Sequence, residues 1–131
     1  MSTKGPFLVV TAVRALGERV RRLLVTERFE VEVVEGEASA VELVRARSPT
    51  VVLLDWSFAA DEAVRDLIHH LRPRRTGPRI VALARPAELI VAAEARGISA
   101  VVGTELDVEQ LVDVVWRLHH EVDAARAGDG A

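Results

Sequence analysis

The most constraining feature of the sequence is an uninterrupted apolar run, residues 51–54, that ends in a single carboxylate, Asp55. A short run of valine and leucine without polar alternation is typical of a strand buried on both faces in the middle of a parallel sheet. In such sheets, ligands gather beyond the carboxyl ends of the strands. The sequence therefore predicts that Asp55 lies where a ligand or a reaction centre would be expected.

Similar patterns divide the rest of the chain into alternating strands and helices. Four further strands are predicted at residues 7–11, 30–34, 80–84 and 99–102. Helices are predicted at residues 14–27, 37–47, 61–71, 86–97 and 108–125. Strands that alternate with helices through short connections predict an α/β fold, a doubly wound five-stranded parallel sheet with helices on both faces. The common strand order for a sheet of this size is 2-1-3-4-5.

The length of 131 residues suits one domain with a substantial core. We expect an N-terminal tail at residues 1–6, the domain at residues 7–125, and a flexible tail or the start of a linker at residues 126–131. Half of the residues are hydrophobic and 28% are charged, as in an ordinary globular protein.

Composition also excludes several classes of function. The net charge of −3 provides no overall basic field for nucleic acid or an anionic membrane. The absence of cysteine excludes disulfides, thiolate nucleophiles and cysteine-based zinc sites. No apolar run reaches the roughly 20 residues that span a bilayer, and the N-terminus has no signal-peptide pattern. We therefore expect a cytoplasmic protein that binds neither nucleic acid nor membrane.

Several segments, in their order and spacing, resemble a bacterial response-regulator receiver domain over residues 7–122. They are Phe7-Leu8-Val9-Val10, the run that ends at Asp55, Arg79-Ile80-Val81-Ala82-Leu83, and Ala95-Arg96-Gly97 ahead of the last strand. The resemblance implies a flavodoxin-like (βα)5 fold. It also implies that Asp55 matches the aspartate that accepts a phosphoryl group from a histidine kinase.

The sequence departs from the family at the other working positions. Receivers bind Mg²⁺ through two adjacent carboxylates after the first strand, and here Thr11 and Ala12 stand there. The hydroxyl after the fourth strand is replaced by Ala84, or by Leu83 if the register slips by one. The family's aromatic switch residue matches Val101.

The basic partner of the phosphoryl group is missing as well. The family's lysine after the fifth strand matches Thr104, which is followed by Glu105, and the only lysine in the chain is Lys4. Arg85, just beyond the fourth strand, is an alternative source of positive charge. Phosphoryl transfer needs positioning and charge neutralisation by a divalent cation, which a hydroxyl and a methyl group cannot hold.

We therefore expect a degenerate receiver, also called a pseudo-receiver or atypical response regulator, in which Asp55 is inactive as a phosphoacceptor. Mg²⁺ binding is expected to be absent or weak, with no other cofactor, no metal site and no enzymatic activity. Unless Asp55 is still phosphorylated, two roles remain open for it: a leftover residue or cap on the following turn, or a contact to a ligand or partner.

The last predicted helix suggests where a partner binds. Its core stripe is predicted at Leu111, Val114 or Val115, Leu118 and Val122. A second face carries Val108, Val112, Trp116, His119 and Asp123. Because tryptophan is enriched at interface hot spots, Trp116, Val112 and His119 are interface candidates. Leu89 and Ile90 of the preceding helix could extend that surface. The alternative is that Trp116 lies flat on its own domain.

Other clusters have simpler interpretations. Trp56 and Phe58, after Asp55, are a second candidate surface, or they fill the space of the missing metal and phosphoryl group. The pairs His69-His70 and His119-His120 lack the spacing of metal ligands on a helix. The arginines at 72, 74, 75 and 79 lack the interleaved aromatic residues of a nucleic-acid site.

The expected function is a phosphorylation-independent signalling module, related to two-component signal transduction, that works by protein–protein contact with a partner or as a homodimer. One alternative is an eroded receiver that is still phosphorylated on Asp55. Another is a small-molecule sensor that reuses the cleft around Asp55, Ala84 and Thr104.

Overall fold

The computed structural model describes residues 4–34, 37–56, 68–69, 76–94, 97–105 and 107–129. Five parallel strands form one sheet in the order β2-β1-β3-β4-β5. The strands are β1 (Lys4–Val10), β2 (Phe29–Val34), β3 (Val51–Asp55), β4 (Arg79–Ala84) and β5 (Ala100–Gly103). The helices are α1 (Arg14–Thr26), α2 (Glu37–Arg47), α4 (Leu89–Glu94) and α5 (Val108–Asp129), with a 3₁₀ turn, η2 (Pro86–Glu88), before α4. The predicted fold class and strand order are confirmed.

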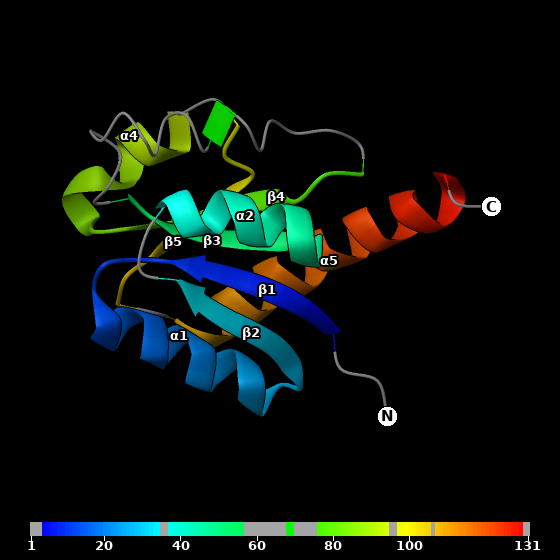
Figure 1. Ribbon diagram of the computed structural model, residues 1–131. Coiled ribbons are helices and arrows are strands. Elements are labelled where there is room, and N and C mark those ends of the chain that lie inside the picture. Colours follow the sequence, from blue (N-terminus) through cyan, green and yellow to red (C-terminus); the bar gives the residue numbers. More distant parts are fainter. Residues whose placement is uncertain are drawn as a thin grey trace.

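The helices form two layers around the sheet (Figure 1), with α1 and α5 on one face and α2 and α4 on the other. Every residue of β3 is buried, because both faces of this central strand are covered. Its side chains alternate between the layers: Leu53 joins the core beneath α1 and α5, and Leu54 joins the core beneath α2.

Both ends of the domain extend further than expected. Strand β1 begins at Lys4, so residues 4–6 do not belong to a tail, and α5 continues to Asp129. The physical reason at the C-terminal end is Arg126, whose guanidinium donates hydrogen bonds to the carbonyl oxygens of Thr76, Ser48 and Pro49 at 2.8, 2.8 and 3.1 Å. These contacts fix the last turns of α5 against two loops.

The helix expected at residues 86–97 begins as a 3₁₀ turn, η2, and continues as α4 to Glu94; residues 95–96 lie outside the described residues. Most of the helix expected at residues 61–71 lies outside the described residues, and residues 68–69 are helical. Phe58, His70 and the arginines at 72, 74 and 75 also lie outside them. No helix in the described part of the chain is both long enough and apolar enough to cross a bilayer.

Gly17 allows α1 to lie close to the sheet. A Cβ atom there would lie 2.7 Å from Cγ1 of Val33 and 3.1 Å from Cγ2 of Thr11. We expect Gly17→Ala to lower the free energy of unfolding by about 1–2 kcal/mol in urea titrations, because overpacking outweighs the gain of about 1 kcal/mol in helix propensity.

Gly103→Ala is the matched control for this prediction. Nothing lies within 4 Å of a Cβ built at Gly103, so this substitution is expected to be neutral or slightly stabilising. A Gly17→Ala variant more stable than the original protein would show that α1 can move away from the sheet at no cost.

Candidate functional site

Asp55 lies at the carboxyl edge of the sheet, where the ends of four strands meet. The strand register pairs Val10 with Leu54, Asp55 with Leu83, and Ala84 with Gly103. Residues that follow β1, β4 and β5 therefore gather around the end of β3.

Both carboxylate oxygens of Asp55 are engaged by neighbouring side chains. The hydroxyl of Thr11 donates a hydrogen bond to Oδ2 at 2.8 Å, and the guanidinium of Arg85 lies 3.7 Å from Oδ1. The Thr11 oxygen also accepts a hydrogen bond from the backbone N–H of Val13 at 3.0 Å, which directs its own hydrogen toward Asp55. The Asp55 side chain is 0% exposed, so these contacts replace water around a buried charge.

Arg85 is held in place by the turn that follows β4. Its backbone N–H donates a hydrogen bond to Oε1 of Glu88 at 2.9 Å, and its guanidinium lies 3.6 Å from the same oxygen. Pro86 is the first residue of this turn, where the fixed φ angle of proline matches the helical backbone. The Arg85 side chain is 44% exposed, so it brings a half-solvated positive charge to the buried Asp55.

The described residues around Asp55 differ from those that hold Mg²⁺. Magnesium prefers several carboxylate and water oxygens in an octahedral arrangement. The side chains after β1 are a neutral hydroxyl, Thr11, and an exposed methyl group, Ala12. A fixed cation, Arg85, already lies beside Asp55. Among the described side chains, a divalent ion beside Asp55 would meet the Asp55 carboxylate, a neutral hydroxyl group and electrostatic repulsion from the guanidinium.

Two of the other positions that differ from receivers, Ala84 and Val101, lie beside a buried tryptophan. Trp56 is 7% exposed and packs against Ala82, Ala84 and Ala92, and Val101 borders the same cluster. The small alanine side chains leave room for the indole ring, so Ala84 is part of a packed cluster rather than an open hydroxyl position. In the turn after β5, Thr104 is half-buried and its N–H donates a hydrogen bond to the carbonyl of Ala84 at 3.0 Å, whereas Glu105 is exposed.

The core stripe predicted for α5 is present, because Leu111, Val115, Leu118 and Val122 are buried. The placement of His119 on an interface was wrong. His119 is 5% exposed, and its Nδ1 atom lies 2.7 Å from the hydroxyl oxygen of Thr50. It follows Val115 by four residues, so it shares the buried side of the helix, where its ring meets Phe7.

Trp116 combines both interpretations of the sequence. Its ring contacts Phe29 at a centroid distance of 5.8 Å and His120 at 4.4 Å, yet the residue is 43% exposed. Val108 and Leu89 are exposed and Val112 is half-buried. The side chain of Ile90 lies outside the described residues.

Sequence reasoning missed the contact between Thr11 and Asp55, and also the contribution of α1 to the surface around Val108. Thr11 and Asp55 are 44 positions apart, so no local pattern relates them.

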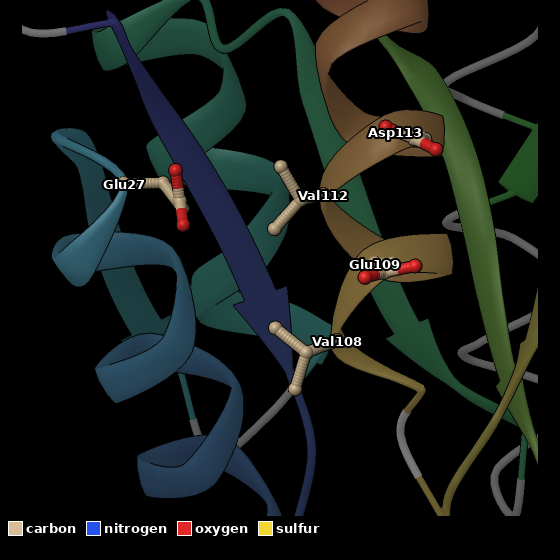
Figure 2. A pocket seen from close by; sticks show the side chains of 5 residues that line it. All are labelled: Glu27, Val108, Glu109, Val112 and Asp113. Atoms are coloured by element: carbon tan, nitrogen blue, oxygen red, sulfur yellow. The ribbon is translucent and has the colours of Figure 1, made fainter.

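Figure 2 shows a hollow between α1 and α5 that is lined by Glu27, Val108, Glu109, Val112 and Asp113. The signal for α1 was present in the spacing of Arg19, Arg22 and Leu23, which share one helix face.

No model of a known protein family matches the sequence, and no curated protein sequence matches it. Solved structures do match. NtrX from Brucella abortus in complex with ADP has a TM-score of 0.83 at 18% identity over 98% of this chain, which spans only 29% of the NtrX chain.

Two other solved structures have nearly the same size as this chain. A response regulator receiver protein from Burkholderia phymatum has a TM-score of 0.74 at 17% identity, over 88% of this chain and 95% of its own. The pseudo-receiver domain of the CikA protein has a TM-score of 0.68 at 21% identity, over 87% and 96%. At these identities the likeness establishes the fold. The chain therefore has the fold of a response-regulator receiver domain.

Proposed function

We propose that this chain is a cytoplasmic receiver-like signalling module that works without phosphorylation of Asp55, through contact with another protein chain. The observation that supports this proposal is the engagement of both Asp55 oxygens by Thr11 and Arg85. In this proposal Asp55 is a structural residue that ties the ends of β1 and β4 to β3.

The chemistry of phosphorylation conflicts with these contacts. A carboxylate oxygen of Asp55 has to reach the phosphorus atom. The oxygens of the phosphoryl group also need a positively charged group or ion that orients them and neutralises their charge. The guanidinium of Arg85 supplies positive charge, but it already lies 3.7 Å from Asp55 and 3.6 Å from Glu88. Phosphorylation would therefore require Thr11 to leave Oδ2 or Arg85 to leave Oδ1 of a buried carboxylate.

The test is incubation with acetyl phosphate and Mg²⁺, followed by intact-mass spectrometry. We expect no phosphoryl adduct on the original protein. The positive control is a variant that restores the family's residues in the same chain: Thr11→Asp, Ala12→Asp and Thr104→Lys. This variant is expected to gain a phosphoryl adduct. The adduct is expected to disappear when Asp55→Asn is added. A stoichiometric adduct at Asp55 of the unmodified chain would overturn the proposal in favour of an eroded but active receiver.

A small-molecule sensor has less support. Two hollows that are lined by described residues lie between α1 and α5, and none of the residues that line them is Asp55, Ala84 or Thr104. Within the described residues, no observation favours a ligand site at Asp55.

A further inference from the structure

Two hollows between α1 and α5 share Val108 and together form one groove, named here the α1–α5 groove. One hollow, of about 340 Å³, is lined by Glu27, Val108, Glu109, Val112 and Asp113. The other, of about 210 Å³, is lined by Arg19, Arg22, Leu23 and Val108. We propose that this groove binds a second copy of the chain, with α1 of each copy lying on α5 of the other.

The floor of the groove is apolar. Val108 is exposed and Leu23 and Val112 are half-buried, and Figure 2 shows Val108 and Val112 on the side of α5 that faces α1. The exposed Trp116 lies further along the same face of α5, eight residues after Val108. Aliphatic floors beside an exposed tryptophan are typical of the central part of protein interfaces.

Apart from Glu27, an acidic residue that lines the groove just after the last turn of α1, the two walls of the groove carry opposite charges. Arg19 and Arg22 lie on α1, whereas Glu109 and Asp113 lie on α5, farther from α1 in Figure 2. All four residues are exposed. In the part of the chain that the structure describes, none of them forms an ion pair.

This charge arrangement is complementary to itself. In a twofold dimer, the same surface of both copies has to match. A twofold axis along the groove places the basic wall of each copy on the acidic wall of the other. An axis across the groove would place α5 on α5 and acid on acid. A partner with one dominant sign of charge would be repelled by one wall, so the second copy fits better than a strongly acidic or basic protein.

This inference rests on the proposed function: the partner is a second copy of the chain, and the contact surface is the α1–α5 groove. The experiment uses the full chain with two variants that reverse one wall each. The first is Arg19→Glu with Arg22→Glu, and the second is Glu109→Arg with Asp113→Arg. Sedimentation velocity over a range of concentrations measures the dimer dissociation constant.

We expect the original chain to dimerise and each variant alone to dimerise at least about tenfold more weakly, because like charges then face each other. An equimolar mixture of the two variants is expected to restore the dimer. In the mixed dimer, the acidic α1 of the first variant faces the basic α5 of the second, and the second contact keeps its native charges. The restored dimer also shows that both variants are folded.

Glu42→Arg is the control, since Glu42 is exposed on α2, on the opposite face of the sheet, and its reversal is expected to leave dimerisation unchanged. A monomeric original chain would overturn the inference. So would a dimer that both variants retain, or variants that stay monomeric when mixed. Each of these results leaves the phosphorylation test unaffected, and an adduct at Asp55 would overturn the proposed function without changing the sedimentation result.

Discussion

Replacement of Trp56 by alanine is expected to lower the free energy of unfolding by about 3–5 kcal/mol. The residue is 7% exposed, and its neighbours Ala82, Ala84 and Ala92 are too small to fill the space that the indole leaves. The cavity therefore adds its own cost to the loss of buried apolar surface. Urea denaturation followed by circular dichroism measures the change.

Trp116→Ala is the matched control for Trp56, because it removes the same side chain from a residue that is 43% exposed. We expect its cost to be clearly smaller when it is measured at concentrations where the protein is monomeric. Equal costs for the two substitutions would contradict the assignment of Trp56 to the core. The same packing predicts that a larger residue at Ala84, such as the threonine of active receivers, would strain this cluster.

Thr11→Val is expected to lower the free energy of unfolding by about 1.5–3 kcal/mol, although valine and threonine have nearly the same shape. The substitution removes the hydroxyl that donates to Oδ2 of Asp55 and leaves a buried carboxylate with one donor fewer. Chemical denaturation at neutral pH, where an ordinary aspartate is ionised, measures the loss.

A double-mutant cycle shows whether this loss depends on Asp55. In the Asp55→Ala background, Thr11→Val is expected to cost much less, with a coupling energy of about 0.5–3 kcal/mol between the two residues. Thr26→Val is the surface control: Thr26 is exposed in the last turn of α1, so the change should stay within about 0.5 kcal/mol. Absence of coupling would remove the main support for a structural Asp55, and with it the proposed function.

Local pattern alone was sufficient for the architecture. The continuous apolar run of β3 reports burial on both faces, and the alternation of strand and helix patterns restricts the chain to a parallel sheet. The loss of chemical groups at Thr11, Ala12 and Thr104 was also visible, because an absent carboxylate or lysine can be read from residue identity.

The sequence already suggested Arg85 as a substitute positive charge, but only the tertiary structure showed that both Thr11 and Arg85 reach Asp55. Thr11 and Arg85 meet Asp55 because β1, β3 and β4 end at the same edge of the sheet, and that proximity depends on strand order rather than on neighbouring residues. The rotation of α5 against the sheet turned His119 inward, toward Thr50, while Trp116 stayed half exposed. Helical periodicity identifies the apolar face of a helix but not the exact border of that face. The side chains at the border are therefore placed by packing against other elements.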